Sequence, residues 1–138
     1  MYIEWKDAYR IGVPRIDEQH QQLIVMINAL YEKIGPGTKP QDVWDLLEGL
    51  NQYADTHFAT EERIARESNV PPAELAAHQT KHESYRDRMV SFRQALEQKD
   101  KHAPVQLMAF ISTWWLTHIL VEDMELGYMI REYGTGDD

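Results

Sequence analysis

The chain has 138 residues, no cysteine and a formal net charge of −9. This length is typical of one domain, so we expect a single domain over residues 1–138. The negative charge argues against nucleic acid as a partner, because binding to nucleic acid needs a basic surface. The lack of cysteine excludes disulfides, thiolate ligands and iron–sulfur clusters.

The start of the chain does not resemble a targeting segment. Residues 1–10 carry four charged side chains and lack the apolar core of a signal peptide. No stretch approaches the roughly 20 apolar residues that span a bilayer. We therefore expect a cytoplasmic protein without a membrane span.

Residues 1–15 are rich in apolar and aromatic side chains, which favours an N-terminal arm that packs on the domain or serves an oligomer interface. A first helix is predicted from near Asp17, as its N-cap, to about Ile34, where the Gly-Pro-Gly sequence at 35–37 stops it. Its apolar stripe runs through His20, Leu23, Ile24, Ile27, Leu30 and Ile34.

Three further helices follow from the same apolar period. The second is predicted over about 41–67, with His57 and Glu61 continuing its core stripe. The third starts after the Pro-Pro pair at 71–72, and its stripe includes His78 and His82. A polar connection at 99–103 leads to the fourth helix, which is predicted from Pro104 to about residue 132, and 133–138 should form a loose tail.

Short connections between long amphipathic helices make neighbouring helices antiparallel. The sequence therefore predicts an all-α protein, an up-down-up-down antiparallel four-helix bundle with an N-terminal arm. Both a monomer and a homo-oligomer are compatible with this pattern.

Five of the six histidines form a spaced set with two carboxylates, and this set is the main functional signal of the chain. Two pairs are four residues apart, so each pair lies on one helix face. In an antiparallel bundle all four helices would bring these side chains to the same end. The candidate metal ligands are His20, His57, Glu61, His78, His82, His118 and Asp123.

Seven ligands exceed the four of a structural zinc site and suit two metal ions that share carboxylates. Imidazole-rich sites accept iron, copper, zinc and nickel, so the ligand set alone does not name the metal. His118 and Asp123 are five residues apart, about 140° around a regular helix. Either they flank the inner stripe or a π-type bulge brings them together.

Four segments, DEQH at 17–20, HFATE at 57–61, HQTKH at 78–82 and HILVED at 118–123, resemble the hemerythrin family, in its single-domain bacterial type. The resemblance implies a non-haem di-iron centre with a bridging oxide or hydroxide that binds O₂ reversibly. It implies one iron held by His78, His82 and His118, and the other by His20 and His57. Glu61 and Asp123 would bridge them, and O₂ would bind at the two-histidine iron.

The expected role is an oxygen carrier, store or delivery protein rather than an enzyme. The alternatives are an O₂ or redox sensor that signals to a separate protein partner, and a di-iron enzyme of the peroxidase or nitric oxide reductase type. A sensor commonly carries an output domain, and turnover would need access for substrate and reductant; the sequence shows neither.

Four residues beside the ligands are expected to line the O₂ pocket: Phe58, Trp114, Trp115 and Ile119. Trp115 stands where the family usually has leucine, so we expect a narrower pocket and slower ligand exchange. Next to Glu61, Glu62 is expected on the exposed helix face. His102 is expected to be a solvated loop residue.

Overall fold

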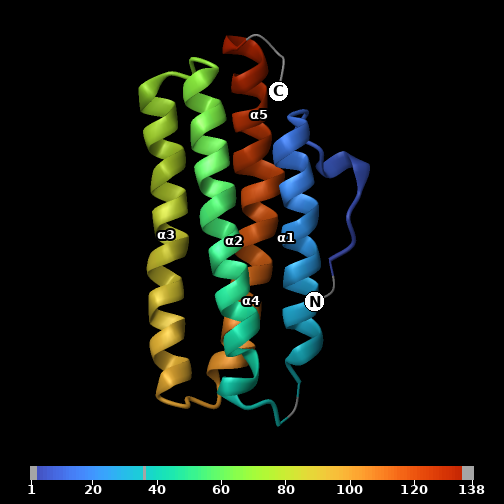
Figure 1. Cartoon of the computed structure of the whole chain (residues 1–138), viewed down its shortest axis with the longest axis vertical. Coiled ribbons are helices and arrows are strands. Elements are labelled where there is room, and N and C mark those ends of the chain that lie inside the picture. The colour runs from blue at the N-terminus through green and yellow to red at the C-terminus, as the bar shows by residue number, and fades with distance from the viewer. Residues whose placement is uncertain (1–2, 36, 135–138) are drawn as a thin grey trace.

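The computed structural model describes residues 3–35 and 37–134, and within these ranges every regular element is helical. Four long rods run in alternating directions, down, up, down and up in the view of Figure 1. The predicted all-α four-helix bundle is confirmed. The first three rods are α1 (Pro14–Lys33), α2 (Pro40–Glu67) and α3 (Pro72–Glu97), and the fourth joins α4 (Ala103–Thr117), a π-helical segment (His118–Glu122) and α5 (Asp123–Tyr133).

The tail expected at 133–138 is wrong at its first residue, because Tyr133 is the last residue of α5. Residues 135–138 lie outside the described part of the chain.

Prolines mark the starts of all four rods. Pro14, Pro40 and Pro72 are the first residues of their helices, and Pro104 is the second residue of α4. Proline suits these positions because its missing N–H would have no partner in the first turn and its φ angle is already helical.

Asp17 is not the N-cap of α1, so the prediction was wrong: the N-cap is Val13, four residues earlier. The N–H of Asp17 donates to the Val13 carbonyl over 2.9 Å, which places Asp17 inside the first turn. Its carboxylate instead accepts hydrogen bonds from the backbone N–H groups of Ile11 (2.7 Å) and Gly12 (3.2 Å). The side chain therefore ties the arm to the start of α1.

The N-terminal arm packs on the bundle. Ile3, Ile11 and Val13 are buried, and the side chain of Asn28 on α1 exchanges two hydrogen bonds with the backbone of Ile3, of 2.8 and 2.7 Å. The arm lies close to α5 at Gly127, where an added Cβ would stand 2.6 Å from the Ile11 carbonyl oxygen. This approach requires glycine.

The buried core falls into two apolar clusters, separated along the bundle by the histidines and carboxylates. The larger cluster contains Leu23, Phe58, Tyr85 and Ile119 among others. The smaller one, with part of the arm, contains Ile11, Val13, Ile16, Ile64, Ala65, Val70, Leu75, Leu126 and Ile130. On α1, for example, His20 lies between Ile16 of the smaller cluster and Leu23 of the larger one. The polar residues thus form one layer across the bundle.

The fourth rod departs from our expectation that no segment is apolar enough to span a bilayer. By length and composition, Ala103–Tyr133 is the one described helix that could cross a membrane, and 44% of its most apolar window is buried inside the bundle. Its buried residues include Trp115, His118 and Asp123. A core helix of a bundle has this composition as well, because one face must be apolar.

Candidate metal centre

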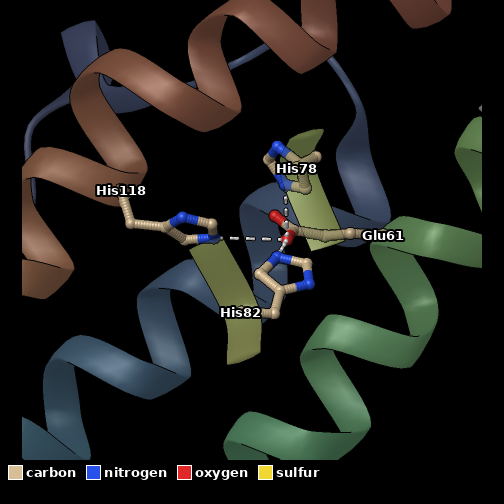
Figure 2. Close-up of side chains that lie close together, drawn as sticks. All are labelled: Glu61, His78, His82 and His118. Carbon is tan, nitrogen blue, oxygen red and sulfur yellow. Dashed lines mark hydrogen bonds and ion pairs between the residues drawn. The ribbon is translucent and has the colours of Figure 1, made fainter. Parts of the chain in front are cut away.

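All seven predicted ligands lie together in the layer between the two apolar clusters. Six have no exposed surface, and His78 is 7% exposed. Their ligand atoms form two groups, each within 4.8 Å, of which Figure 2 shows the first. One group is Glu61, His78, His82 and His118, and the other is His20, His57, Glu61 and Asp123.

Glu61 lies between the two groups and faces each with one oxygen. Its Oε1 is 2.9 Å from Nε2 of His82 and 3.3 Å from Nε2 of both His78 and His118. Its Oε2 is 3.1 Å from His57 Nε2. A carboxylate placed in this way has the arrangement of a bridging ligand.

Asp123 also reaches histidines of both groups. Its Oδ1 is 3.0 Å from His78 Nε2, while its Oδ2 is 2.8 Å from His20 Nε2 and 3.2 Å from His118 Nε2. The two carboxylates are thus surrounded by the five imidazoles.

The π-helical segment explains how His118 and Asp123 share one site. The backbone N–H of Asp123 donates to the carbonyl of His118, five residues earlier. This wider turn brings residues five apart onto the same face, whereas a regular α-helix would separate them. Of the two alternatives open from the sequence, the structure has the bulge.

Three of the five imidazoles are oriented by a hydrogen bond at Nδ1. His57 pairs with Gln19 Oε1 over 2.9 Å, His82 with Glu62 Oε2 over 2.8 Å, and His118 with Glu122 Oε1 over 2.8 Å. In the neutral ring each acceptor favours a proton on Nδ1, which leaves the Nε2 lone pair facing the cluster.

These three acceptors were missed from the sequence. The expectation for Glu62 was wrong, since its side chain is only 21% exposed and is bonded to His82. The four-residue spacing from His118 to Glu122 was a usable signal for one of them.

Three of the site histidines have raised pKa values in the protein without metal. Burial acts to lower the pKa of His20 and His78, but hydrogen bonds to Asp123 and Glu61 outweigh it and raise each pKa to about 9. The pKa of His118 rises to about 10, because the charges of Asp123 and Glu61 outweigh its burial.

The pKa values of the two carboxylates, Glu61 and Asp123, are lowered. Burial and the neighbouring Glu61 act to raise the pKa of Asp123, but His118 and His20 hold it at about 2. Burial opposes ionisation of Glu61 too, and the charge of His57 in particular keeps its pKa well below the usual range. The site is therefore an anionic pair inside a shell of imidazoles.

The donor set fits bound cations. Three inward-facing atoms, His57 Nε2, Glu61 Oε2 and Asp123 Oδ1, are buried and make no hydrogen bond of good geometry, although each lies within 3.1 Å of an imidazole or carboxylate atom of the site. Such atoms destabilise a folded protein unless something satisfies them. Neutral imidazole nitrogens and carboxylate oxygens around them are ligands for divalent transition metals.

Aromatic rings form one wall of the site. Phe58 stacks on His82, with centroids 3.9 Å apart, and on Trp115 at 5.6 Å. Trp115 is also 6.0 Å from the His57 ring, on the side with two histidines. Trp114 is half-buried and stacks on His118 at 4.6 Å, while Ile119 is buried. A role of these four residues in an O₂ pocket stays a prediction.

Comparison with known proteins gives one consistent result. The family described as "Hemerythrin HHE cation binding domain" matches residues 11–130. Bacteriohemerythrin of Clostridium acetobutylicum is 29% identical over 125 residues, which cover 88% of this chain and 95% of that protein. Bacteriohemerythrin of Stenotrophomonas maltophilia is 27% identical over 129 residues, covering 94% of this chain and 82% of that protein.

Solved structures agree on the fold. A crystal structure of a hemerythrin leucine-to-tyrosine mutant superposes with a TM-score of 0.81 at 22% identity, covering 94% of this chain and 98% of that one. The chain belongs to the hemerythrin family, as the four sequence segments predicted, and carries its cation-binding domain.

Proposed function

We propose that this protein binds O₂ reversibly at a di-iron centre and acts as an oxygen carrier, store or delivery protein. The observation that carries the proposal is the pair of overlapping donor groups that share Glu61. The relatives named bacteriohemerythrin support the same function.

The two donor groups differ in a way that matters for ligand binding. His78, His82 and His118 would hold one iron, and His20 and His57 the other, with Glu61 and Asp123 shared. A di-iron centre held there would supply the two electrons and the open coordination position that O₂ binding requires.

The protein's own side chains would keep this binding reversible. Phe58, Trp115 and Ile119 are at most 1% exposed, so this buried apolar wall would exclude water from the site. Carboxylic acids could protonate and expel the ligand, and the two inside the site are held ionised by their imidazole neighbours. The Nδ1 hydrogen bonds from Gln19, Glu62 and Glu122 hold the imidazoles in place.

The test combines metal analysis with visible spectroscopy. Protein loaded with iron is reduced without air, exposed to air and returned to argon. We expect two irons per chain and a charge-transfer band that appears in air and disappears under argon. His57→Ala should lose iron and the band, whereas the exposed His102→Ala should behave as wild type.

One outcome would contradict the proposed role. If air converts the reduced protein irreversibly to the diferric form, the protein is not a carrier. A redox sensor or a di-iron enzyme would then be the better explanation, and the iron content would remain two per chain.

A further inference from the structure

A cleft of about 100 Å³ lies between α3 and α5, next to the metal centre. Its lining includes Glu74, His78 and Lys81 from α3, together with Glu122 and Glu125 from the fourth rod. We call this the acidic cleft. It leads from solvent to one of the candidate ligands.

His78 forms the floor of the acidic cleft. Its side chain is 6% exposed, while the side chains of His20, His57, His82 and His118 have no exposed surface. The Nε2 of His78 faces the cluster, 3.0 Å from Asp123 Oδ1. Figure 2 shows its second nitrogen pointing away from Glu61. This buried ring therefore connects the cluster with the cleft.

The second nitrogen of His78 is free to meet a ligand. Nδ1 of His57, His82 and His118 is bonded to Gln19, Glu62 and Glu122. Among residues 3–35 and 37–134, Nδ1 of His78 has no such acceptor. An imidazole nitrogen that faces a cleft without a hydrogen-bond partner can bind a metal ion once it releases its proton to solvent.

The charges around the cleft favour cations. Three carboxylates, of Glu74, Glu122 and Glu125, face a single ammonium group, that of Lys81. Lys81 Nζ is 3.7 Å from Glu122 Oε2, so its positive charge offsets part of the negative charge of the carboxylates. A cleft lined mainly by one sign of charge raises the local concentration and the arrival rate of the opposite ion.

We propose that the acidic cleft is the entrance by which divalent metal ions reach the centre. The carboxylates of Glu74 and Glu125 attract the hydrated cation, Nδ1 of His78 is the first imidazole that it contacts, and rotation of this ring passes it inward. This inference rests on the proposed function only in requiring that the centre holds metal.

The test measures how fast metal-free protein takes up Co²⁺, whose visible bands report binding to histidine. Stopped-flow mixing at low ionic strength compares wild type with the double variant Glu74→Gln/Glu125→Gln. The control Glu32→Gln/Glu97→Gln removes the same amount of charge at exposed sites. Both sites lie near the C-terminal ends of α1 and α3, whereas Glu74 of the cleft lies near the start of α3. Lys81→Gln removes a positive charge from the cleft and therefore tests for the opposite effect on the loading rate.

We expect the Glu74/Glu125 variant to load about tenfold more slowly, roughly threefold for each charge removed at this range. Lys81→Gln should load about threefold faster, and the Glu32/Glu97 control at the wild-type rate. All differences should shrink in high salt, and the final Co²⁺ content should stay at two per chain in every variant.

Two results would contradict the inferences separately. If wild type binds fewer than two Co²⁺ per chain, the metal centre itself is wrong. If two ions bind but the Glu74/Glu125 variant loads as fast as its control, metal enters elsewhere and only the entrance is refuted. Circular dichroism of each variant confirms that the helices are intact.

Discussion

Replacing Trp115 with leucine tests both the packing and the access role of this indole. Trp115 is fully buried and contacts the rings of Phe58 and Tyr85. Leucine would bury on the order of 80 Å² less apolar surface, which corresponds to about 2 kcal/mol. The unfilled space adds up to about 1 kcal/mol. We expect Trp115→Leu to lower the free energy of unfolding by about 2–3 kcal/mol.

The same vacated space lies beside His57, on the side where O₂ should bind. O₂ association and dissociation should therefore both become faster in Trp115→Leu. Urea unfolding of the metal-free protein, followed by circular dichroism, measures the stability, and stopped-flow and O₂-release kinetics measure the exchange. Using metal-free protein avoids the added stability from bound metal.

Trp114→Leu is the matched control. This neighbouring indole is only half-buried, so its loss should cost about 1 kcal/mol. Although it is also expected to line the O₂ pocket, it stacks on His118 of the three-histidine group, so its loss should change O₂ exchange less than the loss of Trp115 does. If Trp115→Leu is as stable as wild type, the packing argument is refuted. If its exchange rates equal those of wild type, Trp115 does not restrict access.

Three further predictions concern the metal ligands, pH and the arm. Glu62→Leu removes the partner of His82 Nδ1 and should weaken metal affinity by about 10–100-fold, measured by chelator competition. Three histidines of the metal-free protein have pKa values raised to about 9–10, so their stabilisation is complete below about pH 6.5 and is lost as pH rises through 9–10; urea unfolding at pH 6 and pH 10 should show the loss. Gly127→Ala would drive a methyl group into the Ile11 carbonyl and should destabilise by about 1–3 kcal/mol, whereas Gly49→Ala, whose nearest neighbour is 3.8 Å away, should stabilise by about 0.5–1 kcal/mol.

Each of these three predictions has an outcome that would contradict it. Unchanged chelator competition in Glu62→Leu would mean that the hydrogen bond to His82 does not support the ligand. Equal stability at pH 6 and pH 10 would mean that the imidazoles are not held protonated by the carboxylates. If Gly127→Ala has the same free energy of unfolding as wild type, the arm can move away from the added methyl group without destabilising the protein.

The fold and the ligand set could be predicted from the sequence because both depend on spacing along single helices. Residues four apart share a face, as His78 and His82 do, and the apolar stripes continue through these positions. Short connections then force neighbouring helices to be antiparallel, which brings all four ligand segments to one layer.

Other features depended on how the helices sit against one another. Gln19 and Glu62 meet His57 and His82 only because the rotations of α1, α2 and α3 aim these side chains across helix interfaces. The acidic cleft likewise needs α3 and α5 side by side.

Local geometry decided the remaining points. The spacing of His118 and Asp123 left two arrangements open, and only the backbone hydrogen bond between them shows the π-helical turn. Asp17 has the chemistry of an N-cap, yet its carboxylate is used by the arm. The sequence by itself determined which residues lie on the inner faces, since that follows from helical period. The tertiary structure decided which groups those residues meet, because hydrogen bonds across helices depend on relative rotation, register and rotamer, which no single helix encodes.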